Sequence, residues 1–101
     1  MLKVTVLYNQ PDSAEDFEKY YAETHLPLAA KMEGVHKLET TKFSPGPDAG
    51  APEYYRMAEM YFESPEQIQA TLGSEAGRAT VDDLKNFATG GVKILAGVLD
   101  S

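Results

Sequence analysis

One of the two histidines of the chain, His25, stands at the midpoint of the segment YYAETHLPLAAKMEG (residues 20–34). Imidazole changes its charge near neutral pH, so a histidine can act as a general acid or base. Two residues later comes Pro27, which has no amide hydrogen and would clash with the carbonyl of Glu23 in a regular helix. We therefore expect the helix to break or kink near His25 and to restart with Pro27 in its first turn. Such a break leaves room for a cavity beside the imidazole ring.

The position of His25 allows two interpretations. The residue lies one turn after Tyr21 and three residues before Leu28, beside the expected apolar stripe, so its ring should point toward the margin of the core. In the first interpretation it is a general acid or base, or a hydrogen-bond donor to a carbonyl or hydroxyl group, at the mouth of an apolar pocket. In the second it caps free carbonyl groups at the helix break, where the partial negative charge of a helix C-terminus favours imidazolium.

Two carboxylates are further candidates for proton transfer, and each also has a structural explanation. Glu59 is charged in the middle of an apolar strand segment. It could be a catalytic base, or it could pair across the sheet with Lys37 or Lys3. Asp83 follows Thr80 by three residues, a spacing that a helix cap explains without any chemistry, and we favour the cap.

Six tyrosines and four phenylalanines supply aromatic surface for a core or a pocket. The side chains expected to reach the space between helix and sheet, and to contact a bound molecule there, are Tyr8, Tyr21, Leu28, Tyr61 and Phe87. The alternative is that they only fill the core, which is the commoner role of aromatic residues. A buried tyrosine hydroxyl needs a hydrogen-bond partner, and His25 is a candidate.

The residue types that build metal and cofactor sites are scarce. The chain has no cysteine, which excludes disulfides, thiolate metal sites and a nucleophilic thiol. His36 follows His25 by eleven residues with no third ligand at a recognisable spacing, so we expect no metal site. There is no glycine-rich phosphate loop, nucleophile elbow or dinucleotide fingerprint. We therefore expect no cofactor, with His25 as an axial haem ligand as the alternative.

Length and charge restrict the protein class. The 101 residues suffice for one domain, which we place at residues 1–101. Nine basic against sixteen acidic residues give a net charge of −7, and the basic residues are scattered singly, so no nucleic acid is expected to bind. The first residues lack the apolar run of a signal peptide, and the longest apolar run, ILAGVL, is too short to span a bilayer. We expect a cytoplasmic protein without membrane attachment.

The periodicity of apolar residues predicts four strands with helical regions between them. The expected strands are residues 2–9, 35–43, 54–63 and 92–100, and the expected helical regions are residues 13–34 (interrupted near Pro27), 65–72 and 74–88. The proline- and glycine-rich residues 44–53 form a long loop. The order β-α-β-β-α-β is that of a ferredoxin-like α+β sandwich, an antiparallel four-stranded sheet with helices on one face.

The face of this sheet that no helix covers is too apolar for free exposure. The residues expected there are Leu7, Leu95 and Leu99, mixed with Lys3, Thr5 and Lys93. Two copies of the chain can cover this face by packing against each other, so we infer a homodimer with twofold symmetry.

With these elements in place, the chain resembles the EthD-type members of the dimeric α+β barrel superfamily. The resemblance rests on the stretches KVTVLY, YYAETHLPL and VDDLKNF in this order of elements. It implies a small homodimer in which each subunit holds a pocket between helices and sheet. The family is associated with bacterial degradation of ethyl tert-butyl ether alongside a haem monooxygenase system. Related barrels include cofactor-free monooxygenases, lactone isomerases, polyketide-modifying enzymes and haem enzymes, so the family gives a fold and a pocket but no single reaction.

Two functional hypotheses follow. In the first, the protein is a cofactor-independent enzyme, a monooxygenase-like oxidoreductase or an isomerase. It acts on a small hydrophobic metabolite such as an ether, aromatic or polyketide-type catabolite, with His25 moving the proton and a tyrosine or Glu59 assisting. In the second, a non-catalytic binding or accessory protein holds such a metabolite for a partner oxygenase, and His25 only orients it.

Overall fold

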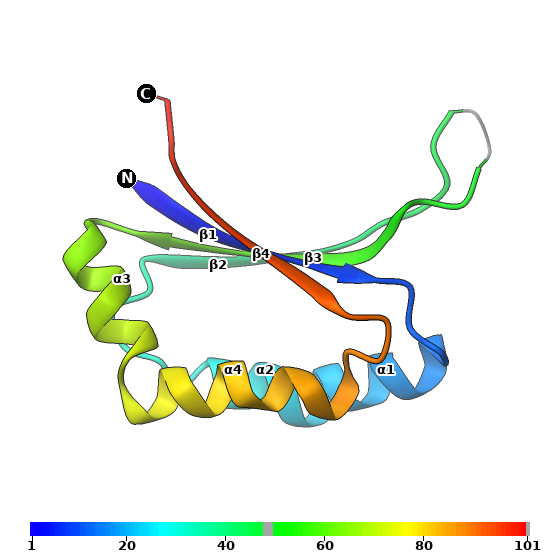
Figure 1. Cartoon of the computed structure of the whole chain (residues 1–101), viewed down its shortest axis with the longest axis horizontal. Helices are drawn as coiled ribbons and strands as arrows, with labels where there is room; N and C mark the ends of the chain where they lie inside the picture. Colours follow the sequence, from blue (N-terminus) through cyan, green and yellow to red (C-terminus); the bar gives the residue numbers. More distant parts are fainter. Residues whose placement is uncertain (48–49, 101) are drawn as a thin grey trace.

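The computed structural model describes residues 1–47 and 50–100, which form a four-stranded antiparallel sheet with the helices on one face (Figure 1). The strands are β1 (Leu2–Asn9), β2 (Lys37–Lys42), β3 (Tyr54–Phe62) and β4 (Val92–Val98). The helices are α1 (Ala14–Tyr20), the π-helical turn η1 (Tyr21–His25), α2 (Leu26–Ala29), α3 (Pro65–Leu72) and α4 (Glu75–Phe87). The predicted ferredoxin-like α+β fold is confirmed.

The strand order is β2-β3-β1-β4, so β1 and β3 are the central strands. β1 pairs antiparallel with both neighbours, and Val4 lies opposite Met60 on one side and Ala96 on the other. The helical segments that follow β1 and β3 both return across the same face of the sheet (Figure 1). Residues from the first and second halves of the chain can therefore meet in one site between helices and sheet.

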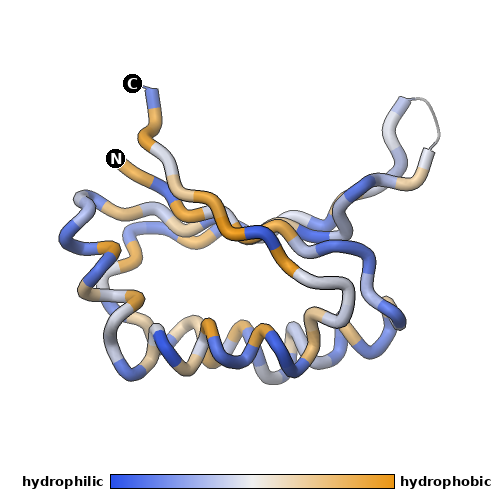
Figure 2. The backbone as a smooth tube through the Cα atoms, viewed as in Figure 1, coloured by the Kyte–Doolittle hydropathy of each residue, from blue (hydrophilic) through white to orange (hydrophobic). Residues whose placement is uncertain are grey.

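The core lies between the sheet and the helices. The buried strand residues are Val4, Val6 and Tyr8 of β1 and Tyr55, Ala58, Met60 and Phe62 of β3. An aromatic cluster packs against α1, η1 and the C-terminal half of α4, and a separate cluster of aliphatic residues, methionines and Phe62 packs against α2 and α3. Hydrophilic residues occupy much of the helix surface that faces away from the sheet (Figure 2). The helices are thus amphipathic and bind to the sheet through their apolar sides.

The first helical region continues through Pro27 because one of its turns is widened. The amide of Leu26 donates to the carbonyl of Tyr21, five residues back, and Pro27 lies in the first turn of α2. Tyr21, His25 and Ala29 follow one another at intervals of four residues, and all three are buried. In a regular helix with 3.6 residues per turn, side chains at this spacing would turn progressively away from the sheet, and the wider π-helical turn reduces that rotation. The expected break is therefore a π-helical turn, and the His25 side chain does not cap carbonyl groups there.

A register shift near the start of β3 turns two consecutive side chains toward the helices. Tyr8 pairs with Arg56 whereas Asn9 pairs with Tyr54, so Tyr55 is an extra residue in β3. Tyr55 packs its ring against α1, and Arg56 forms hydrogen bonds to α1. Strict alternation predicts that Tyr55 and Arg56 face opposite sides, and the bulge corrects this expectation.

Serine caps fix the two helices that follow β3. Ser64 Oγ accepts a hydrogen bond from the amide of Gln67 at the start of α3, and Ser74 Oγ accepts one from the amide of Gly77 at the start of α4. The Gln67 side chain donates to the Thr71 hydroxyl and does not return to the cap. Gly77 lies so close to the end of α3 that a Cβ atom there would collide with the backbone of Thr71 and the next residue.

The element ends differ from the predicted ones by a few residues. β2 begins at Lys37, not at residue 35, and β4 ends at Val98. Gly34 lies between α2 and β2 with φ of 90°, a conformation that favours glycine. The longest helix, α4, has 13 residues, and no helix of the described part of the chain is long and apolar enough to cross a membrane.

Replacing Gly77 by Ala should lower the free energy of unfolding by about 1–3 kcal/mol, because the added methyl group overpacks the contact between α3 and α4. This is opposite in sign to helix propensity, which favours Ala over Gly by about 1 kcal/mol. Urea unfolding measures the sum of the two effects, and overpacking should dominate. The control is Asp82→Ala, at an exposed position of the same helix, where the change should stay within about 0.5 kcal/mol. A Gly77→Ala protein as stable as the wild type would contradict the close packing.

Candidate functional site

His25 and Asp83 form a buried hydrogen-bonded pair that joins two helical segments distant in the chain. The distance from His25 Nδ1 to Asp83 Oδ2 is 2.9 Å, and the two residues are only 5% and 7% exposed. The ring of Phe87, one turn after Asp83 on α4, packs against the imidazole with 4.6 Å between centroids. The Tyr21 ring stacks near the imidazole at 5.8 Å. These contacts fix the orientation of the His25 ring.

Both oxygens of the Asp83 carboxylate accept hydrogen bonds. The Tyr20 hydroxyl donates to Oδ1 at 2.6 Å and the Asn86 side-chain amide donates to the same atom at 3.0 Å, while Oδ2 faces His25. Burial opposes ionisation, but the hydrogen bonds from Tyr20, Asn86 and His25 outweigh it and hold the pKa of Asp83 below its ordinary value. An ionised carboxylate can only accept, so Nδ1 of His25 carries the hydrogen and Nε2 is the ring nitrogen that can exchange a proton with a bound molecule.

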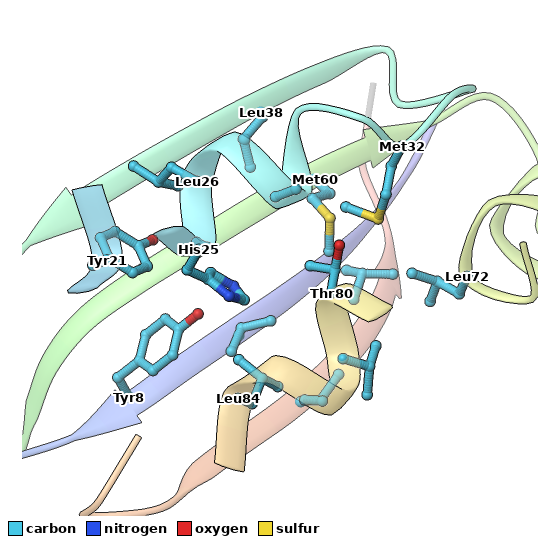
Figure 3. A pocket seen from close by; sticks show the side chains of 16 residues that line it. Tyr8, Tyr21, His25, Leu26, Met32, Leu38, Met60, Leu72, Thr80 and Leu84 are labelled. Atoms are coloured by element: carbon cyan, nitrogen blue, oxygen red, sulfur yellow. The ribbon is translucent and has the colours of Figure 1, made fainter. Parts of the chain in front are cut away.

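A mostly apolar pocket lies beside His25, between the helices and the sheet (Figure 3). Its volume is about 60 Å³, counted as the space open to the centre of a water molecule. The aliphatic and methionine residues that line it are Val4, Val6, Leu26, Ala29, Met32, Leu38, Ala58, Met60, Leu72, Val81, Leu84 and Ile94. Leu38, Val81 and Ile94 are exposed at the protein surface, so the pocket is within reach of solvent.

Four polar side chains line the pocket: Tyr8, Tyr21, His25 and Thr80. The Thr80 hydroxyl donates to the carbonyl of Ala76, whereas the buried O–H group of Tyr21 lies beside the Tyr8 hydroxyl and has no well-aligned acceptor among the described residues. Burial, reinforced by the neighbouring Tyr21, raises the pKa of Tyr8 well above its ordinary value. Burial also raises the pKa of Tyr21. Both phenols therefore remain protonated hydrogen-bond donors at neutral pH.

An ion pair lies behind Tyr21, outside the pocket wall. Arg56 donates through Nε and a terminal nitrogen to the two carboxylate oxygens of Glu18, at 2.8 and 2.6 Å. The same guanidinium lies 5.0 Å from the centroid of the Tyr21 ring. Hydrogen bonds from Arg56 hold the pKa of Glu18 below its ordinary value. The positive charge nearest the Tyr21 ring is thus already compensated.

Glu59 and Tyr61 lie on the face of the sheet opposite to His25. Glu59 Oε2 accepts a hydrogen bond from Lys3 Nζ at 2.8 Å, and the Tyr61 hydroxyl donates to Glu39 at 2.8 Å. Cross-strand pairing of Glu59, one of the two explanations drawn from the sequence, is confirmed with Lys3 as its partner. The sheet itself separates Glu59 and Tyr61 from His25, which corrects the expectation that they share its site.

Leu28 and Phe87 take positions beside the pocket and not in its wall. Phe87 supports the His25 ring from α4, and half-buried Leu28 is replaced in the lining by its neighbours Leu26 and Ala29. The π-helical turn rotates the residues that follow it, so a stripe counted with regular helical spacing selects the wrong neighbour.

The donor groups of the site fit proton transfer better than metal binding. Within residues 1–47 and 50–100, no three histidine or carboxylate side chains converge as metal ligands do. His36 is exposed, on the stretch before β2, and takes no part in the His25 pair.

The role of Asp83 is the main feature that sequence reasoning missed. Asp83 lies in the interior of α4 and not at its cap, so the capping interpretation is wrong. A sequence signal did exist, because Asp83, Asn86 and Phe87 are spaced by three and four residues and share one helix face. Nothing in the spacing, however, links this face to Tyr20 and His25 about sixty residues earlier.

Replacing Asp83 by Asn should lower the free energy of unfolding at neutral pH by about 1–3 kcal/mol, because its buried partners lose a charged acceptor. A folded-state pKa below the ordinary value of 3.8 gives stability that is complete above that value and is lost as the pH falls through the lowered folded value. The difference between wild type and variant should therefore shrink in strongly acid solution.

Urea unfolding as a function of pH measures this difference. The matched control is Asp82→Asn, at the exposed neighbouring position, which should leave the stability unchanged within about 0.5 kcal/mol. A difference between wild type and Asp83→Asn that stays constant into strong acid would show that the ionised carboxylate is not its source.

Comparison with known proteins places this site in a family. The family model of the EthD domain matches residues 9–91. An uncharacterized 11.0 kDa protein of Rhodococcus erythropolis, in the thcB-thcC intergenic region, is 33% identical over 95 residues, which cover 94% of this chain and 91% of that protein. The crystal structure of an ethyl tert-butyl ether d (ethd) family protein from Bacillus halodurans has a TM-score of 0.93 and 30% identity, over 99% of both chains.

A more distant structure shares the fold. It is a dimeric protein of unknown function with a ferredoxin-like fold from Bacteroides fragilis, with a TM-score of 0.70 and 14% identity over 97% of this chain and 95% of that one. The EthD match spans both His25 and Asp83, the two halves of the buried pair. From the extent of that match and the identity to its relatives, the chain belongs to the EthD family.

Proposed function

We propose that the protein is a cofactor-independent enzyme in which His25 transfers a proton on a small, mostly apolar molecule that carries a carbonyl, lactone or phenol group. The observation that carries the proposal is the 2.9 Å hydrogen bond between His25 Nδ1 and Asp83 Oδ2 at the wall of an apolar pocket. A histidine oriented by a buried carboxylate is the arrangement that general-base catalysis uses.

The proposed step needs only the groups that this chain supplies. Neutral His25 accepts a proton at Nε2 from a carbon next to the substrate carbonyl, and the electron pair of the broken C–H bond moves to the carbonyl oxygen as an enolate. The ionised Asp83 stabilises the imidazolium that forms. His25 then returns the proton to the same or another carbon, which gives exchange or isomerisation without any oxidant. A phenol would lose its O–H proton to the same nitrogen.

Asp83 takes the assisting role in this proposal, in place of Glu59. Its hydrogen bonds to Tyr20 and Asn86 hold the carboxylate still, and the contact between Phe87 and the imidazole limits ring rotation. A base held in one tautomer and one orientation avoids the reorganisation that a mobile group would need during each turnover.

A second candidate function uses the same pocket without chemistry. The small enclosed volume and its mostly apolar lining also suit a binding or accessory protein that holds a hydrophobic metabolite for a partner oxygenase. His25 would then only orient the ligand through a hydrogen bond.

We further propose a homodimer formed through the face of the sheet that carries no helix. Leu7, Met57 and Leu95 lie on this face by the strand register, next to the pair of Lys3 and Glu59, and Leu95 is half exposed. An apolar sheet face of this kind is covered in stable proteins. The ferredoxin-like protein of Bacteroides fragilis is dimeric, which supports a dimer here.

Light scattering at micromolar concentration should give a mass of about 22 kDa, twice the 11.1 kDa of one chain. Leu95→Glu should reduce the mass toward that of one chain, because it places a charge on the face that the dimer would bury. Lys85→Glu, on the exposed side of α4, is the control and should leave the dimer intact. A wild-type mass of 11.1 kDa would refute the dimer.

Proton transfer can be tested without the natural substrate, by the exchange of α-hydrogens of 2-alkanones for deuterium in D₂O, followed by proton NMR. The wild type should accelerate exchange, and His25→Ala should reduce the acceleration by about 10²- to 10⁴-fold, the usual contribution of a positioned base. Asp83→Asn should reduce it less, because the base remains but its tautomer and orientation are no longer fixed.

The control for this assay is Glu59→Gln, which changes a carboxylate on the opposite face of the sheet and should leave exchange unchanged. Equal exchange by wild type and His25→Ala across the ketone series would contradict the proposed function. Retention of a ketone without exchange would support the binding alternative.

A further inference from the structure

We propose that the pocket recognises a neutral, amphiphilic molecule. Its hydrogen-bond-accepting oxygen lies at the end formed by Tyr8, Tyr21 and His25, and its aliphatic tail lies against Met32, Met60 and Leu72. This inference rests on the proposed function because it uses the same pocket, and it adds the class and the direction of the ligand. Figure 3 shows the two phenols and the imidazole at one end of the pocket and the two methionines and Leu72 toward the other.

The O–H group of Tyr21 is the observation that points to an oxygen acceptor. Tyr21 is 2% exposed and lines the pocket, and the Tyr8 hydroxyl lies beside its hydroxyl, but the Tyr21 O–H group has no well-aligned acceptor among the described residues. A buried hydroxyl without a partner costs free energy, so such groups are normally paired. A ligand oxygen placed in the pocket can supply the missing acceptor.

The charges around the pocket favour a neutral ligand. Asp83 already places a negative charge directly behind His25, and the Arg56 guanidinium near Tyr21 is engaged by Glu18. Among the described residues, no lysine or arginine side chain lines the pocket wall. A carboxylate or phosphate would lose its hydration without gaining a cation, which is costly in an apolar site.

The opposite end of the pocket provides apolar contacts, which do not fix the orientation of a ligand. Met32, Met60 and Leu72 present thioether and aliphatic groups, and methionine side chains adapt to ligands of different shape. Exposed Leu38 and Ile94 also contribute to the lining, so a tail that outgrows the enclosed space can continue along apolar surface. An aliphatic chain matches this end, and its affinity should increase with each methylene group that becomes buried.

The test compares three probe series of equal chain length with the full chain at neutral pH: 2-alkanones, 2-methyl-1-alkenes and alkanoates. The alkene has the shape of the ketone but no oxygen acceptor, and the alkanoate carries a charge. Dissociation constants come from shifts of amide signals in proton–nitrogen NMR spectra. The ketone should bind about three- to tenfold more tightly than the alkene, and each added methylene should tighten binding up to about fourfold until the pocket is filled.

Tyr21→Phe should abolish the preference for ketone over alkene, because it removes the donor and keeps the ring. Tyr55→Phe is the matched control: Tyr55 has the other buried hydroxyl without a well-aligned hydrogen bond among the described residues, but it lies near Glu18, outside the pocket wall, so the preference should persist. The ratio of the two dissociation constants cancels any general effect of either variant on binding.

Three outcomes would overturn the inference: no binding of the ketones, tighter binding of the alkanoates, or the same ketone preference in Tyr21→Phe and Tyr55→Phe. The exchange assay with His25→Ala tests the proposed catalysis, and its result does not depend on the result of this binding test. Ketone binding that depends on Tyr21, without exchange, would keep this inference and refute the proposed catalysis. Exchange without any effect of Tyr21→Phe on ketone selectivity would do the reverse.

Discussion

The hydrogen bond between His25 and Asp83 is the interaction on which the site depends, because it joins the helical segment after β1 to the helix after α3. Neither partner has a reason to be buried alone. A buried carboxylate must be paired, and a buried imidazole needs an acceptor for its N–H group. The pair satisfies both requirements, and within the described part of the chain it uses only Nδ1 of the His25 ring. The fold thus places an imidazole with its carboxylate partner inside an apolar layer.

The π-helical turn makes this pairing possible. A proline two residues after His25 would interrupt a regular helix, and a break would send the imidazole to solvent or to nearby carbonyl groups. The widened turn accommodates Pro27, which has no amide hydrogen, so the chain stays helical. It also keeps His25 on the buried side together with Tyr21. Turns of this kind are often found at functional sites, since they persist only where surrounding contacts compensate for their weaker geometry.

Sequence reasoning succeeded where a pattern is local and failed where contacts are distant. The alternation of apolar residues in β1 and the order of the elements were enough to predict the fold, because the strand period is a property of neighbouring residues. The bulge at Tyr55 left no local signal. The partner of His25 could not be found either, because many carboxylates of an acidic chain were equally available and only the packing of α4 selects Asp83.

The two faces of the sheet carry different sets of polar groups. On the face without helices, Lys3 pairs with Glu59 across the strands and Lys37 pairs with Glu39, whose carboxylate also accepts a hydrogen bond from the Tyr61 hydroxyl. On the helix-facing side, Arg56 and Glu18 pair behind Tyr21, and the Asp83 carboxylate lies behind His25. In the proposed function, neutral donors stabilise the enolate oxygen in this pocket, and phenols with raised pKa values are modest donors. The proposal therefore favours substrates whose hydrogen is already acidified by a carbonyl or lactone group over substrates that require a strong base.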